Sequence, residues 1–222
     1  MHFNGDTQCL PLYRYDNSNR LDNITDYALH AFQTQYGDAS ITRQQIFAYT
    51  YAVLNHPAYR AKYALNLRQE FPRIPYYADF AQWAAWGDAL LKLHLEFETA
   101  DPYALQIIET APDTDNPALL ERLRKAKLKA DHVSGEIVLD GLTSLRGVPS
   151  VAWQYRLGNR SALEWILERY RETTPKDPTI RERFNTYQFR AYKAQVIDLL
   201  RRVCTVSVET MRVLGAMPQE TL

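Results

Sequence analysis

The chain has 222 residues, of which 46% are hydrophobic and 23% charged, a composition typical of globular proteins that can fill a core. Lys and Arg number 26 and so do Asp and Glu, so the net charge does not favour a polyanionic partner. The two cysteines, Cys9 and Cys204, exclude a disulfide framework and a Cys-rich zinc site. The sequence lacks a signal peptide and any apolar run near the roughly 18–20 residues of a membrane span, so we expect a cytoplasmic protein.

The charge is distributed unevenly along the chain. Residues 1–110 hold 8 basic and 12 acidic residues, a net charge of −4, whereas residues 111–222 hold 18 and 14, a net charge of +4. Prolines and acidic residues are concentrated between residues 99 and 118, which is typical of a boundary. We therefore expect an acidic helical part over 1–110 and a basic part over 111–222, packed together as one compact domain.

Capping signals and apolar spacing predict four helices in the first part: residues 23–36, 42–55, 57–71 and 80–94. Asn23 is the expected N-cap of the first helix, and Gly37 ends it. Thr42 and Gln45 have the spacing of a capping box, in which each side chain bonds the backbone of the other residue. Pro57 is suited to the first position of a helix.

The apolar pattern changes period in the second part. Alternating residues predict strands over 127–131 and 136–140, joined by turn residues 132–135, and a third strand over 142–145. A capping box at Ser161 and Glu164 begins one helix, Asp177-Pro178 begins another, and a long terminal helix runs from Phe189. The predicted fold class is α+β, mostly helical with a small antiparallel β insert.

The motifs of several enzyme classes are missing from the sequence. No two glycines lie closer than six positions apart, which excludes the glycine loops that bind dinucleotides and nucleoside triphosphates. There is no HExxH, no GxSxG and no kinase signature. No acidic residue is followed two positions later by lysine, and the one Asn-Pro continues as Ala-Leu instead of Pro-aromatic. We therefore expect neither a catalytic centre nor a metal site in this chain.

Cations mixed with amide and tyrosine side chains between residues 122 and 160 suit nucleic acid. Lys and Arg bind phosphates, while Arg, Asn and Gln read base edges in the major groove. The alternative is a solvated basic face whose charges pair with Glu121, Glu164 and Glu168, and composition alone favours it. The candidate DNA-binding residues are Lys125, Lys127, Lys129, Arg146, Gln154, Tyr155, Arg156, Asn159 and Arg160.

Several long phrases of the sequence resemble one family. They are LPLYRYD (10–16), NRLDNITDYAL (19–29), the stretch 45–75 with AYTYAVLNHPAYR, YRLGNRSALEWILERY (155–170) and VIDLLRRVCTVSVETM (196–211). The family is the C-terminal target-recognition (specificity) region of single-polypeptide Type ISP restriction–modification enzymes and their helicase–methyltransferase relatives. The similarity extends from about Gln8 to Met217.

The resemblance implies a domain that binds double-stranded DNA for the upstream adenine amino methyltransferase and nuclease/translocase of the same polypeptide, without a membrane partner. S-adenosylmethionine, ATP and Mg²⁺ are then expected only in the upstream domains of the parent enzyme. Arg156, Asn159 and Arg160 precede a helix N-terminus, which favours phosphate. The alternative is a helical coupling module that packs against the methyltransferase or motor without binding DNA, which the acidic first part favours.

Overall fold

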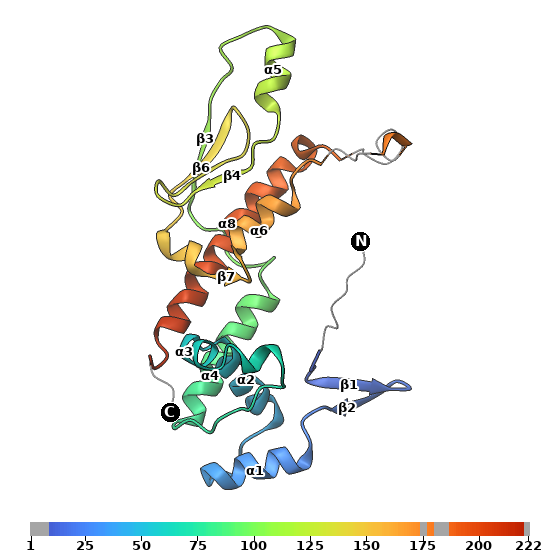
Figure 1. Cartoon of the computed structure of the whole chain (residues 1–222), viewed down its shortest axis with the longest axis vertical. Coiled ribbons are helices and arrows are strands. Elements are labelled where there is room, and N and C mark those ends of the chain that lie inside the picture. The colour runs from blue at the N-terminus through green and yellow to red at the C-terminus, as the bar shows by residue number, and fades with distance from the viewer. Residues whose placement is uncertain (1–8, 174–176, 180–186, 220–222) are drawn as a thin grey trace. The chain divides into compact units, whose positions relative to one another are not determined.

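The computed structural model describes residues 9–173, 177–179 and 187–219 (Figure 1). The chain forms two compact units: unit 1 comprises Met1–Lys92 and Val213–Leu222, and unit 2 comprises Leu93–Arg212. Each unit has its own hydrophobic core. The division at residue 110 remains a prediction, because it concerns charge and proline content whereas these units are defined by packing. Among the described residues, no helix is long and apolar enough to cross a membrane.

Unit 1 consists of a hairpin followed by helices. The elements are β1 (Tyr13–Asp16), β2 (Asn19–Asp22), α1 (Asp26–Tyr36), α2 (Arg43–Asn55), α3 (Pro57–Lys62), the 3-10 turn η1 (Asn66–Arg68) and α4 (Phe80–Leu95). The four predicted helices are therefore present, although the ends of two differ from the prediction. Strands β1 and β2 pair antiparallel.

The prediction that Asn23 caps α1 was wrong. Thr25 is the N-cap, and its hydroxyl accepts the N–H of Ala28 at 3.2 Å. The Asn23 amide instead donates to the carbonyl of Pro11 at 2.8 Å, so this side chain is used at the base of the hairpin. Gly37 ends the helix as expected, with a left-handed φ of 64° that glycine adopts without strain.

Helix α2 begins with the predicted capping box. The Thr42 hydroxyl accepts the Gln45 N–H at 3.3 Å, and the Gln45 side chain accepts the Thr42 N–H at 2.9 Å. The next helix starts at Pro57 as expected but ends at Lys62, well before the predicted end near Phe71. The 3-10 turn η1 follows, and after it comes a segment whose backbone bonds to tyrosine side chains.

Residues 71–79 form an extended segment outside the regular elements. Three tyrosine hydroxyls donate to alternate carbonyls along it: Tyr59 to Arg73 (2.9 Å), Tyr49 to Pro75 (2.6 Å) and Tyr36 to Tyr77 (2.8 Å). The Tyr49 hydroxyl also accepts the Tyr77 N–H at 2.7 Å. Side-chain hydroxyls thus satisfy backbone groups that have no strand or helix partner.

Unit 2 combines a four-stranded antiparallel sheet with helices, in the strand order β3-β6-β5-β4. The elements are β3 (Gln106–Glu109), α5 (Pro117–Arg124), β4 (Lys129–Asp131), β5 (Glu136–Val138), β6 (Thr143–Arg146), the 3-10 turn η2 (Ser150–Gln154), β7 (Arg156–Leu157), β8 (Arg160–Ser161), α6 (Ala162–Arg169) and α8 (Phe189–Gly215). The predicted hairpin, third strand, second capping box and terminal helix are confirmed, as is the α+β class. The helix predicted from Asp177-Pro178 extends into residues outside those described.

The sheet of unit 2 has one buried and one exposed face. Ala130, Ile137 and Leu145 lie opposite one another across β4, β5 and β6, and the last two are fully buried. They share a core with Leu163 of α6 and Leu200 of α8. Because side chains alternate along a strand, the neighbouring residues of these strands lie on the opposite face.

Cys204 of α8 belongs to the same core and is fully buried. Burial raises the pKa of its thiol to about 12, so the side chain stays protonated and packs as a small hydrophobe. This agrees with the apolar spacing of the terminal helix.

Candidate nucleic-acid interface

The nine candidate DNA-binding residues all lie in unit 2, at three places. Lys125 and Lys127 follow α5; Lys129 and Arg146 lie on the sheet; Gln154, Tyr155, Arg156, Asn159 and Arg160 lie on η2 and the hairpin β7–β8. Seven of them are exposed, whereas Tyr155 and Arg160 are half-buried. The structure therefore distributes the predicted site over three places in unit 2.

The exposed face of the sheet carries several polar and charged side chains. Arg146 lies opposite Glu136 across β5 and β6, and its Nε is 3.0 Å from Glu136 Oε1. The Ser144 hydroxyl donates to the same oxygen at 2.6 Å. These contacts, the Ser144 hydrogen bond first, lower the pKa of Glu136 below its ordinary value, so a carboxylate holds Arg146 in place at neutral pH. Lys129, on the edge strand β4, belongs to the same face.

A short hairpin presents Arg156 and Asn159. Strands β7 and β8 pair through a two-residue turn of Gly158 and Asn159, and Gly158 has a φ of 71°. The Arg156 guanidinium donates to the Asn159 carbonyl across this turn. Trp165 of α6 donates its indole N–H to the Leu157 carbonyl at 2.7 Å, which fixes the hairpin to the helix.

The N-terminus of α6 is occupied by its own capping box. The Glu164 carboxylate accepts both the N–H and the hydroxyl of Ser161 at 2.8 Å, and the Ser161 hydroxyl accepts the Glu164 N–H at 3.3 Å. A carboxylate thus already lies where a phosphate is expected to bind a helix N-terminus. Contact of this loop with phosphate therefore falls to the side chains of Arg156 and Arg160.

A polar hollow of about 370 Å³ brings together Lys129 and Arg160, which come from separate stretches of the sequence. Arg171 lines it as a third cation, and Glu164 and Glu168 are the acidic groups in its wall. Glu168 lies 3.8 Å from Arg160 and 3.4 Å from Arg171. The hollow therefore carries three basic and two acidic side chains, which leaves a positive balance.

The alternative of an ion-paired basic face applies to part of the surface. Arg146 and Arg160 have carboxylate partners. By contrast, in the part of the chain that the structure describes, no ion pair joins an acidic group to the remaining four candidate cations, Lys125, Lys127, Lys129 and Arg156. These four charges remain available to a phosphate backbone.

Tyr155 has an internal contact instead of a free surface. Its ring stacks on that of His94, with centroids 5.4 Å apart and an interplanar angle of 14°. The Nε2 atom of His94 is 3.0 Å from the Thr210 hydroxyl, and burial lowers the pKa of this imidazole. Both rings line an apolar hollow of about 530 Å³ with the exposed Leu157 and Trp165. No pattern in the sequence indicates this hollow, because exposed and core apolar residues share the same spacing.

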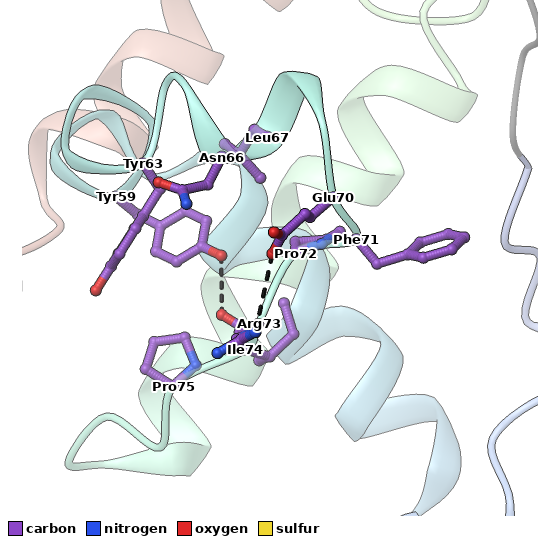
Figure 2. Close-up of a pocket in the computed structure, with 10 residues that line it drawn as sticks. All are labelled: Tyr59, Tyr63, Asn66, Leu67, Glu70, Phe71, Pro72, Arg73, Ile74 and Pro75. Atoms are coloured by element: carbon purple, nitrogen blue, oxygen red, sulfur yellow. Dashed lines mark hydrogen bonds and ion pairs between the residues drawn. The ribbon is translucent and has the colours of Figure 1, made fainter.

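Unit 1 contains a hollow of about 510 Å³ beside the extended segment. Figure 2 shows the Tyr59 hydroxyl directed at the Arg73 carbonyl and the Phe71 ring directed away from it. The charged side chains in its wall are Arg73 and Glu70, which lie 3.8 Å apart. No candidate residue lies there, and this neutral pair gives phosphate no excess of positive charge.

The described residues include no group of three or more His, Cys, Asp or Glu side chains that could hold a metal ion. The acidic groups of the hollow on unit 2, Glu164 and Glu168, instead pair with His132, Arg160 and Arg171. The arrangement is suited to binding a polyanion through side chains.

The chain is similar to a known protein family and to solved structures. The family model of the Type ISP C-terminal specificity domain matches residues 1–199. A chain in a cryoEM structure of a DrdV–DNA complex is 61% identical, with a TM-score of 0.92, and the match covers 96% of this chain and 22% of that one. None of the curated proteins compared with the chain matches it.

Two further solved structures have the same fold. One is a nuclease-deletion mutant of the Type ISP restriction-modification enzyme LlaGI in complex with a DNA substrate mimic, with 26% identity, a TM-score of 0.64, and coverage of 94% of this chain and 18% of that one. The other is the ATP-dependent Type ISP restriction-modification enzyme LlaBIII bound to DNA, with 22% identity, a TM-score of 0.67, and coverage of 95% and 13%. The chain thus spans less than a quarter of each solved chain.

Proposed function

Because the chain belongs to the family of Type ISP C-terminal specificity domains, we propose that it binds duplex DNA and selects the target site for a larger restriction–modification polypeptide. The observation that carries the proposal is the 61% identity, over 96% of this chain, to part of a protein solved in a DNA complex. The exposed, unpaired cations of unit 2 support it, because phosphate contacts supply most of the affinity for DNA.

In this proposal the candidate residues have two roles, phosphate binding and base reading. Lys129 and Arg160, around the polar hollow, bind phosphates and fix the register of the duplex. Arg156, on the hairpin β7–β8, binds phosphate with them, while Asn159 and Gln154 read base edges. Tyr155 supports this surface from inside, through its stack on His94.

The parent polypeptide in this proposal is a bacterial defence enzyme. An adenine amino methyltransferase and a nuclease/translocase precede the present region, and S-adenosylmethionine, ATP and Mg²⁺ act there. The target adenine is extruded from the duplex into the methyltransferase while the present domain holds the site. A cytoplasmic location, where the DNA and a reducing environment are found, belongs to the same proposal.

Lys129→Ala and Arg156→Ala test the proposed surface, because neither side chain has an ion-pair partner to release. We expect each to weaken binding to duplex DNA and to reduce the dependence of log K on log salt by about one for each lost phosphate contact. Arg212→Ala is the matched control, since this exposed arginine of unit 2 pairs with Glu209. Equal affinities and salt slopes in all three variants would exclude these residues from the interface.

The coupling module is a second candidate, favoured by the apolar hollow of unit 2. Leu157 and Trp165 are 47% and 42% exposed at its edge, which suits a protein contact. This candidate predicts no salt-dependent DNA affinity for the chain. It also predicts that Trp165→Ala weakens association with the methyltransferase region supplied as a separate chain.

A further inference from the structure

The hairpin β1–β2 of unit 1 is exposed on both faces. Seven of its eight strand residues are exposed, and Tyr13 is half-buried. An isolated two-stranded hairpin is only marginally stable in water. A partner that binds an exposed hairpin therefore stabilises it. Leu21 is the only aliphatic side chain in the two strands, so the hairpin offers too little apolar surface for a protein core.

The hairpin is fixed at its base and free at its tip. Contacts at the base are Asn23 N–H to the Leu12 carbonyl (2.9 Å), the Asn23 amide to the Pro11 carbonyl (2.8 Å), the Gln44 amide to the Tyr13 hydroxyl (3.1 Å) and Arg43 Nε to the Asp22 carboxylate (3.8 Å). Figure 1 shows the turn end of the hairpin projecting away from α1 and α2. The hairpin is therefore held in a defined direction while its end remains accessible.

The tip carries hydrogen-bonding side chains. Asn17 and Ser18 form a two-residue turn with φ values of 45° and 81°, and Asn19 begins β2. Positive φ at both positions is the geometry of a type I′ turn, whose twist matches that of the strands. Within the described ranges these three side chains have no hydrogen-bond partner. Asparagine amides can bond adenine through two atoms.

The two arginines of the hairpin lie on opposite faces. Tyr15 pairs with Arg20 and Arg14 pairs with Leu21, so adjacent pairs alternate between the faces. The Arg20 guanidinium stacks 4.4 Å from the centre of the Tyr13 ring, which orients it. Since Asp22 lies near Arg43 at the base, the projecting part holds two basic residues against one acidic residue, Asp16.

These features favour a nucleic-acid groove as the partner. Two strands with side chains on both faces have a thickness on the order of 10 Å, and the major groove, about 12 Å wide, admits a two-stranded β-ribbon. We propose that β1–β2 enters the major groove tip first, with Asn17 and Asn19 at base edges and Arg14 and Arg20 at the phosphates on either side. This inference rests on the proposed DNA binding and adds a reading element outside the basic part of the sequence.

The tip is tested by the double variant Asn17→Gly, Asn19→Ala in the full chain. Glycine tolerates the positive φ at residue 17, so the turn is kept while the amide is removed. Selection from a pool of random duplexes should enrich one site for the wild type. In the variant we expect roughly a 5- to 150-fold loss of discrimination at one or two adjacent base pairs, with an unchanged salt slope.

The faces are tested by Arg14→Ala and Arg20→Ala. Each should weaken binding to all duplexes alike and reduce the salt slope by about one, with an unchanged thermal melt. Arg73→Ala is the control, because this arginine is 94% exposed in the same unit and projects from a different segment. It should leave both affinity and slope unchanged.

The outcomes separate the inference from the function on which it rests. If the wild type binds and selects a site while the hairpin variants match it in preference and slope, the hairpin is not a DNA element and the inference is overturned. If those variants instead lose association with the methyltransferase region, the partner is a protein and the inference is equally overturned. If the wild type binds no duplex at low salt, the proposed function fails first and the inference falls with it.

Discussion

The two units hold their cores together with different side chains. Unit 1 packs rings on rings: Tyr77 stacks on Trp83 with centroids 4.3 Å apart, and Tyr49 stacks on Phe80 at 5.2 Å. The core of unit 2 is dominated by aliphatic residues of the sheet, α6 and α8. The difference corresponds to what each core must support, an irregular extended segment in unit 1 and a regular sheet in unit 2.

The comparison shows two ways to satisfy a non-helical backbone. In the sheet, neighbouring strands provide the partners, so the buried side chains need no polar atoms. Among the residues that the structure describes, no strand pairs with the segment 71–79, and tyrosine hydroxyls provide the partners while their rings fill the core. Stability should therefore depend on buried volume in unit 2 and on single hydroxyl groups in unit 1.

The largest effect is expected from Leu145→Ala. Leu145 is fully buried at the centre of the sheet, and removal of a buried leucine costs about 2–5 kcal/mol of unfolding free energy because a cavity remains. Hydrogen exchange should show the loss in the amides of unit 2. Equal loss of protection in both units would contradict the separation of the two cores.

Tyr49→Phe should be the next largest, at about 1–3 kcal/mol. The ring is kept, but the Pro75 carbonyl and the Tyr77 N–H lose their shared partner inside the core. Tyr27→Phe is the matched control, because Tyr27 is 84% exposed and should change stability little. If chemical denaturation gives the same result for both variants, the hydroxyl has no supporting role in unit 1.

The two capping boxes give a smaller and paired prediction. Ser161→Ala and Thr42→Ala each remove an N-cap hydroxyl, at a cost of about 0.5–2 kcal/mol. Ser161 is fully buried whereas Thr42 is exposed, so we expect the larger cost at Ser161, where solvent cannot replace the lost bond. Urea unfolding of the two variants checks the order, and a larger cost at Thr42 would reverse the comparison.

The smallest change in stability near neutral pH is expected from a rise in pH. The loss of stability should begin at a different pH in each unit. Burial raises the pKa of Cys204 and of Tyr77, each to about 12, from ordinary values of 9.0 and 10.0. The unfolded chain therefore loses these protons first, so stability falls above about pH 9 in unit 2 and above about pH 10 in unit 1. Proteolysis with peptide mapping between pH 8 and 11 measures this, and Cys204→Ala should remove the earlier onset. Simultaneous onset in the two units would contradict it.

Local signals predicted many of the elements. The capping boxes at Thr42 and Ser161, the hairpin of β4 and β5, and the terminal helix depend on residues close in sequence, and all are present. Strand β3 was missed because its pairing with β6 is non-local, and its proline-rich surroundings resemble a linker. The early end of α3 at Lys62 was missed because no glycine or proline marks it before Pro72.

The residues of the candidate site were predicted, but their arrangement in space was not. Lys129 and Arg160 meet around one hollow because the turn after β4 docks on the next elements: the His132 ring stacks on Trp153 at 4.5 Å, and its Nε2 lies 3.2 Å from Glu164. Composition could not reveal that contact. The exposed hairpin β1–β2 was overlooked because its charges are balanced in number, and only the structure shows which of them project.

Binding of the full chain to random-sequence duplex DNA, followed by fluorescence anisotropy at two salt concentrations, tests the central claim most directly. The proposed specificity domain should bind at low salt and weaken steeply as salt rises, because counterions are released from each phosphate that it contacts. Absence of binding even at low salt, with the fold intact, would contradict DNA recognition by this chain and favour the coupling module.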